Sequence, residues 1–194
     1  DRKQPEAKVY DAVVAQDGTG DYTTVQAAID AAPANRVKPW LIFIKEGKYK
    51  EHVDLPANKP YLYFIGQGRE KVSITDDKLC GGSNALSVDK GATFVAHAAN
   101  LYFEGLSFVN SYGVEKNDGP QALALNTEND RIVFNKVGMY SYQDTWITTS
   151  KSNYRHYVKD SFIEGAVDFI YNSGNVYFDN DTLNIVRKSG GYIV

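Results

Sequence analysis

The sequence predicts an all-β protein, a parallel β-helix closed at its N-terminal end by one helix. Three observations support this class: short β-branched and aromatic runs separated by Gly, Asn, Asp and Ser, a repeat in the second half, and a single convincing helical pattern. Aromatic residues make up 13% of the 194 residues, with 14 Tyr and one Met, which favours strands over helical bundles.

The one predicted helix covers residues 23–32, where Val25, Ala28, Ile29 and Ala32 recur at helical spacing. Thr23 and Gln26, three residues apart, form the pattern of a capping box, and the next residue, Pro33, stops the helix. An uncovered end of a solenoid exposes strand edges and core. We therefore expect the helix to cover the first coil.

The rest of the chain reads as strands. The predicted runs cover residues 41–47, 61–66, 93–95, 101–109, 131–140, 157–163 and 176–186. Four of them share a unit in which an apolar anchor is followed by polar or small residues and then by further apolar ones.

The anchors of these units are Phe103, Phe134, Val158 and Phe178, separated by 31, 24 and 20 residues. Repeats in this range are typical of solenoids. A crossover to a parallel strand in a β-α-β unit needs a dozen or more residues for the connection alone, so these units are too short for that fold. One coil per unit, with loops of variable length, is the economical solution.

Composition fits one soluble globular domain over residues 1–194, with 43% hydrophobic residues, 23% charged residues and a net charge of −3. No apolar span of 18 residues is present, and we expect any export signal to have been removed. Without a Lys/Arg run, nucleic acid and anionic membranes are excluded as electrostatic partners. A polyanion would have to be held by local contacts. The single cysteine, Cys80, is interpreted as a loop or core thiol.

Two aspartates occupy the same phase of consecutive units, because Asp144 and Asp168 each follow their anchor by ten residues. If the coils stack in register, the two carboxylates lie about 4.7–4.9 Å apart, the spacing of neighbouring strands. Like charges this close do not both ionise readily, so one group should hold a proton and the other act as nucleophile or base. The alternative is a pair of solvated turn aspartates.

Two glutamines favour the catalytic interpretation. Gln143 directly precedes Asp144, and Gln121 lies 22 residues earlier, close to one coil away. Amide donors beside an acid and a nucleophile are what a tetrahedral oxyanion needs. A single glutamine is more often a surface residue, so this hypothesis depends on the cluster.

Four ordered segments resemble the motifs of the pectin methylesterase family: Gly47-Lys48-Tyr49-Lys50-Glu51, Gln121-Ala122-Leu123-Ala124-Leu125, Gln143-Asp144-Thr145 and Asp168-Phe169-Ile170-Tyr171. Residues 17–33 are also similar to the N-terminal stretch of that family, and the resemblance runs from about Val13 to the last residue. It implies a right-handed parallel β-helix that hydrolyses methyl esters of pectin without a metal or another cofactor.

The resemblance also implies roles for individual residues. Asp168 attacks the ester carbonyl, while Gln121 and Gln143 stabilise the oxyanion. Asp144 first protonates the departing methanol and then activates water. Val167 and Tyr171 line the sugar subsite, although both could equally be packing residues. Since pectin lies outside cells, the implied location is secreted, periplasmic or at the cell surface, and the implied state is a monomer.

Two features depart from the family pattern. Asn172 stands where the family has Gly after the Tyr, and the family motif Leu-Gly-Arg-Pro-Trp is absent. Neither Arg69 nor Arg187 has the context of the arginine in that motif. We therefore expect a chain that lacks C-terminal coils and has weak or no activity alone. The three histidines, His52, His97 and His156, show no metal-ligand spacing.

Other functions remain open. A galacturonan hydrolase would also use paired carboxylates but would not need the glutamines. A calcium-dependent lyase would need a basic residue and more acidic ligands than this groove offers. A non-catalytic carbohydrate-binding solenoid is the alternative outside the enzymes.

Overall fold

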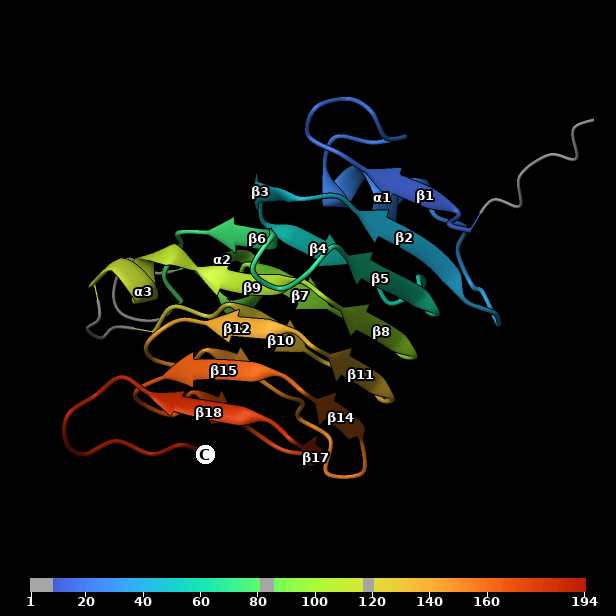
Figure 1. Ribbon diagram of the computed structural model, residues 1–194. Helices are drawn as coiled ribbons and strands as arrows, with labels where there is room; N and C mark the ends of the chain where they lie inside the picture. Colours follow the sequence, from blue (N-terminus) through green and yellow to red (C-terminus); the bar gives the residue numbers. More distant parts are fainter. Residues whose placement is uncertain (1–8, 81–85, 117–120) are drawn as a thin grey trace, which may run out of the picture.

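A computed structural model describes residues 9–80, 86–116 and 121–194. Three parallel sheets wrap around a common core, and successive coils stack from β1 at one end to β17 and β18 at the other (Figure 1). Each coil from β2 to β16 contributes one strand to each sheet. The predicted class, a parallel β-helix with an N-terminal capping helix, is confirmed.

The strands fall into the three sheets as follows. The seven-stranded sheet contains β1 (Ala12–Val14), β2 (Trp40–Ile44), β5 (Leu62–Gly66), β8 (Leu101–Glu104), β11 (Ile132–Asn135), β14 (Arg155–Lys159) and β17 (Asn175–Asp179). The six-stranded sheet contains β3 (Gly47–Lys50), β6 (Val72–Asp76), β9 (Ser107–Asn110), β12 (Gly138–Tyr140), β15 (Phe162–Gly165) and β18 (Thr182–Ile185). The five-stranded sheet contains β4 (Val53–Leu55), β7 (Phe94–Ala96), β10 (Leu125–Thr127), β13 (Trp146–Ile147) and β16 (Ile170–Tyr171).

The four anchors stack in register along the seven-stranded sheet. Phe134 is paired with Phe103 on one side and with Val158 on the other, and Val158 is paired with Phe178. The rings of Phe103 and Phe134 are nearly parallel, with centroids 5.3 Å apart and an interplanar angle of 11°. Phe64 continues the column, 5.0 Å from Phe103. Offset stacking of buried rings adds to the hydrophobic stabilisation of the core.

Each of the four long predicted runs with an anchor is in fact two strands joined by a sharp bend. The bends lie at Gly105, Lys136, Asp160 and Asn180, which have φ values of 63°, 54°, 49° and 60°. The main-chain N–H groups of the first three each donate to the carbonyl of the residue preceding the next bend, so the bends form a column. The prediction of one strand per run was wrong because a single left-handed residue turns the chain without interrupting the apolar pattern.

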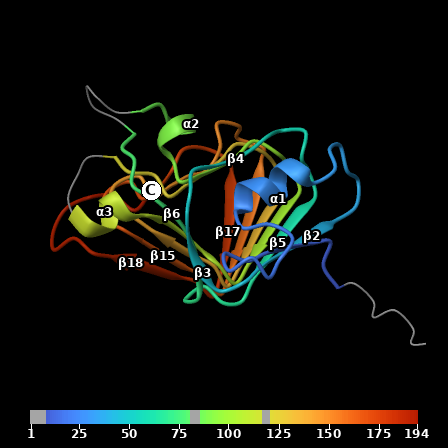
Figure 2. The ribbon, with the colours of Figure 1, turned by 90° about the horizontal axis from the view of Figure 1, so that it is seen from above.

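Helix α1 (Val25–Ala31) lies across the first coils and buries Val25, Ala28 and Ile29 (Figure 2). The predicted capping box was wrong by one residue, because the N-cap is Thr24, whose hydroxyl accepts from the N–H of Ala27 at 3.2 Å. Glu51, the residue that follows β3, provides the rest of the cap. Its carboxylate accepts the N–H groups of Val25 and Gln26 at 2.9 and 2.8 Å.

Several short elements lie outside the predicted runs. They are the strands β1, β4, β6, β10, β13 and β16, all of β3 except Gly47, and the helices α2 (Val88–Gly91) and α3 (Ser111–Lys116). None of these strands exceeds five residues. In the ranges that the structure covers, every helix is too short and too polar to cross a membrane.

Candidate active site

Asp144 and Asp168 lie at the same corner of consecutive coils, between the six-stranded and five-stranded sheets. Asp144 stands between β12 and β13, and Asp168 between β15 and β16. Gln143 forms a parallel bridge with Val167, and the N–H of Asp144 donates to the carbonyl of Val167 at 3.0 Å. The two aspartates are therefore opposite each other, as the ten-residue phase predicts.

The same backbone conformation turns the chain at both aspartates. Their φ values are 60° for Asp144 and 46° for Asp168, in the left-handed region that Asp tolerates better than most residues. Because the two residues occupy equivalent positions and share this conformation, their Cα–Cβ bonds point in the same direction. The short polar side chain thus suits the turn itself.

Asp144 is the more buried of the two aspartates. It is 2% exposed, and its Oδ2 has no hydrogen-bond partner within the described ranges. Burial, and then the charge of Asp168, raise the pKa of Asp144 to about 7. A neutral carboxylic acid beside a second carboxyl group is the arrangement expected for a general acid next to a nucleophile.

Hydrogen bonds from neighbouring hydroxyl groups fix the turn around Asp144. Ser141 donates its hydroxyl to the carbonyl of Ala122 on the preceding coil. Thr145 donates its hydroxyl to the carbonyl of Glu164 on the following coil at 2.8 Å. Sequence analysis assigned no role to Ser141, and it showed Thr145 only as part of the motif around Asp144.

The two glutamines lie on adjacent coils. The N–H of Ala122, the residue after Gln121, donates to the carbonyl of Gln143 at 3.1 Å. The register of the ladder from Leu125 to Trp146 puts Gln143 opposite Ala122, so the glutamines are offset by one residue. Both side chains are half-buried, and neither carboxamide forms a hydrogen bond with the residues that the structure covers.

Val167 and Tyr171 flank Asp168, and both are half-buried. Tyr171 belongs to β16 and is paired with Ile147 in β13. The pKa of the Tyr171 phenol is raised by burial first, and then by the charge of Asp144. The phenol therefore lies within the electrostatic influence of the aspartate pair.

Arg69 and Arg187 do not contact the aspartate pair. Arg69 packs over the ring of Phe162 and donates to the carbonyl of Asp160 at 3.2 Å. Arg187 is exposed. Throughout the described ranges, no arginine forms an ion pair or hydrogen bond with Asp168.

The histidines and the cysteine also have structural surroundings. The carbonyl of Ala92 is 2.7 Å from Nδ1 of His52, and His97 lies between the carboxylates of Asp54 and Glu128. His156 is buried in the core, and Cys80 is buried in a small apolar cluster, as predicted. Over the ranges described here, no group of three His, Cys, Asp or Glu side chains could hold a metal ion.

Comparisons with known proteins agree with this fold. Residues 11–191 match the family model described as Pectinesterase. The chain is 36% identical over 177 residues to a pectinesterase of Petunia integrifolia, covering 91% of this chain and 45% of that protein. It is 35% identical to pectinesterase 1 of Solanum lycopersicum, covering 99% of this chain and 34% of that protein.

Solved structures give the same result. Carrot pectin methylesterase superposes with a TM-score of 0.84 at 32% identity, covering 97% of this chain and 56% of that chain. The pectin methylesterase PemA of Erwinia chrysanthemi gives 0.77 at 28% identity, with 91% and 56% covered. A pectin methylesterase in complex with a hexasaccharide gives 0.78 at 27% identity, with 91% and 56% covered.

The chain spans only about a third to a half of the length of the curated relatives above. Within that span the match extends over nearly every coil that the structure describes. The family model, the sequence relatives and the solved structures all agree, and the chain belongs to the pectinesterase family.

Proposed function

We propose that the protein carrying this chain is a pectin methylesterase, which hydrolyses methyl esters of polygalacturonate to methanol and free carboxylates. The observation that carries the proposal is the pairing of Asp168 with a buried Asp144, whose pKa is raised to about 7, in a chain of the pectinesterase family. A solved relative binds a hexasaccharide, which supports a polysaccharide as the substrate.

The first half of the reaction forms an acyl-enzyme. A carboxylate oxygen of Asp168 attacks the ester carbonyl carbon, and the carbonyl electron pair moves onto its oxygen. The carboxamides of Gln121 and Gln143 donate to this oxyanion. As the intermediate collapses, the bond to the methoxy oxygen breaks and Asp144 gives that oxygen its proton, releasing methanol.

The second half returns the enzyme to its starting state. Asp144, now a carboxylate, takes a proton from a water molecule, whose oxygen attacks the same carbonyl carbon. Collapse of this second intermediate breaks the bond to Asp168 and releases the galacturonic acid. Asp144 is protonated again and Asp168 is again a carboxylate, so the net reaction consumes one water per ester.

The sugar chain needs contacts beyond the reacting groups. Val167 and Tyr171 flank Asp168 on the same corner, and we assign them to the subsite that holds the reacting galacturonate. The polymer lies outside cells, so the protein acts outside the cytoplasm: secreted, periplasmic or held at the cell surface. No partner subunit is required by this mechanism.

Methanol release from highly methylated pectin tests the proposal, in the 194-residue chain and in the full-length natural protein that contains it. Asp168→Asn should reduce the rate at least 100-fold, which corresponds to about 2.7 kcal/mol of transition-state stabilisation. The matched control is Asp160→Asn, because Asp160 also has a left-handed backbone on the same coil but lies at a different corner. Equal loss in both variants would contradict the assignment of the nucleophile.

Product analysis separates the other polysaccharide-active enzymes. A hydrolase of the galacturonan chain would release new reducing ends without methanol. A lyase would produce unsaturated sugars that absorb in the ultraviolet. Binding of pectin by the folded full-length protein without any product would favour the non-catalytic solenoid.

A further inference from the structure

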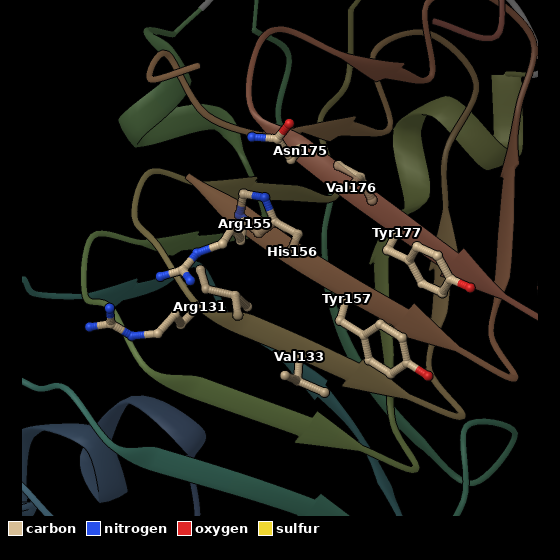
Figure 3. A pocket seen from close by; sticks show the side chains of 9 residues that line it. Arg131, Val133, Arg155, His156, Tyr157, Asn175, Val176 and Tyr177 are labelled. Carbon is tan, nitrogen blue, oxygen red and sulfur yellow. The ribbon is translucent and has the colours of Figure 1, made fainter. Parts of the chain in front are cut away.

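A groove with a volume of about 500 Å³ crosses the outer face of the seven-stranded sheet, over β11, β14 and β17 (Figure 3). The aspartate pair stands at the corner between the other two sheets, so this groove is separate from the candidate active site. Residues that line the groove include Arg131, Val133, Arg155, Tyr157, Asn175 and Tyr177.

One wall of the groove is cationic. Arg131 and Arg155 begin two neighbouring coils, and their side chains are 55% and 60% exposed. Both contact Asp130: Arg155 through Nη2 at 2.6 Å and Nε at 3.1 Å, and Arg131 through Nη1 at 3.3 Å. Because two guanidinium groups share one carboxylate, the cluster keeps a net positive charge. Each guanidinium also keeps N–H donors for a second carboxylate.

The other wall is aromatic. Tyr157 and Tyr177 are paired across β14 and β17, and their rings are stacked with centroids 5.7 Å apart and an angle of 13°. The preceding position of the same row is Val133, which is paired with Tyr157. The Tyr157 ring therefore stands between an aliphatic and an aromatic side chain, and its outer edge faces the groove. Tyr177 lies on β17, the last described strand of the sheet.

These two walls match a uronate, a pyranose ring that carries one carboxylate. The arginines can form charge-assisted hydrogen bonds with the carboxylate, while the tyrosines offer apolar surface to the C–H groups of the ring. A neutral sugar lacks the charge, and a small anion lacks the ring. The acidic group nearest the tyrosines, Asp179, accepts the hydroxyl of Tyr157 at 2.6 Å.

We propose that this groove is an accessory binding site for de-esterified galacturonate residues of the same polymer that the active site processes. The proposal rests on the proposed function for the identity of the polymer. With a net charge of −3, the protein repels a polyanion overall, so retention requires local cationic contacts of this kind. Methyl esterification removes the charge that the arginines recognise, so the site should prefer the product of the esterase reaction.

The test is a titration of the folded 194-residue chain with trigalacturonate, followed by NMR of the arginine Nε–H groups. The Nε–H signals of Arg131 and Arg155 should shift and saturate. Fully methyl-esterified trigalacturonate, maltotriose and acetate should each give less than a tenth of that response at the same concentration. An equal response to acetate overturns the sugar component of the proposal, and an equal response to maltotriose overturns the charge component.

Two variants locate the contacts. Tyr177→Ala and Arg131→Gln should each weaken trigalacturonate binding about 10-fold, which corresponds to about 1.4 kcal/mol. Arg187→Gln, at another exposed arginine outside the groove, is the matched control and should have no effect. Unchanged binding in both groove variants overturns the proposal.

Methanol release from a short esterified oligomer separates this inference from the proposed function. The groove variants should keep the wild-type rate of the full-length protein, because their residues lie outside the aspartate corner. Arginine signals that shift in a protein without esterase activity leave the groove standing and reject the proposed function. An active esterase whose arginine signals do not shift gives the opposite result.

Discussion

Asp144 lies opposite Asp168 on the neighbouring coil, held there by the hydrogen bond from its own N–H to the carbonyl of Val167. The separation of the two residues is therefore set by the spacing of parallel strands, about 4.8 Å. Burial, and then the charge of Asp168, raise the pKa of Asp144 to about 7.

Replacing Asp144 by Asn should stabilise the protein at neutral and alkaline pH. The folded pKa of about 7 exceeds the ordinary value of 3.8, so the unfolded chain loses its proton first as the pH rises. The wild-type free energy of unfolding therefore falls between about pH 4 and pH 7, by up to roughly 4 kcal/mol. Asp144→Asn removes this loss. Urea denaturation of both proteins at pH 4 and pH 8 measures it, and parallel pH profiles would refute the assignment.

His156 should make the protein sensitive to acid. Its side chain is 3% exposed, both ring nitrogens lack a hydrogen-bond partner in the described coils, and its ring packs at 88° against Trp146. Burial lowers its pKa to about 4, against an opposing effect of Asp130, so the unfolded chain binds a proton that the folded core excludes. The associated stability is complete above pH 6.5 and is lost as the pH falls towards 4, by roughly 3 kcal/mol.

His156→Leu keeps the volume of the core and removes the titrating group. We expect the difference in the free energy of unfolding between the variant and the wild type to grow in favour of the variant from pH 7 to pH 4. Thermal unfolding over this range measures it. His97→Leu is a partly exposed histidine control, and an equal change in that variant would count against the role of His156.

Gly165→Ala should disturb the turn that positions Asp168. A Cβ atom at Gly165 would collide with Cβ and Cγ of Phe169 and lie 2.9 Å from Oγ1 of Thr145. Overpacking of this kind costs about 1–3 kcal/mol. We expect a lower melting temperature and a reduced rate of methanol release in the full-length protein. A fully stable variant with normal activity would show that the turn can relax.

Asn172→Gly should stabilise the fold modestly. Asn172 has a φ of 100°, outside the ordinary left-handed region, where glycine alone is unstrained. Relief of the strain outweighs the extra flexibility of the unfolded glycine, for a net gain of about 1 kcal/mol. Asn35→Gly is the control, because its φ of 54° is comfortable for Asn. Calorimetry of both variants gives the comparison, and an equal gain at Asn35 contradicts the explanation.

The periodic core was predictable from sequence because its signal is strong. The anchors Phe103, Phe134, Val158 and Phe178 pair in register, and the equal distance from anchor to aspartate placed Asp144 beside Asp168. The apolar anchor repeats once per coil. In a stack of parallel strands, residues at equal distances from their anchors lie side by side on neighbouring coils.

Local geometry was less predictable. The helix cap moved from Thr23 to Thr24 because Glu51, 26 residues after Val25, supplies the second half of the cap. The phase argument also left open which aspartate holds the proton. That depends on the burial of Asp144 under neighbouring coils, which no local pattern records.

The column of bends at Gly105, Lys136, Asp160 and Asn180 has a consequence for how such a protein can diversify. The fold requires only a main-chain angle at these positions, and four side chains of different size and charge satisfy it. Asp144 and Asp168 have the same left-handed main-chain conformation at their corner. New reactive groups can therefore be exchanged at the corners of the coil while the aromatic column inside remains untouched, so chemistry and architecture can change independently.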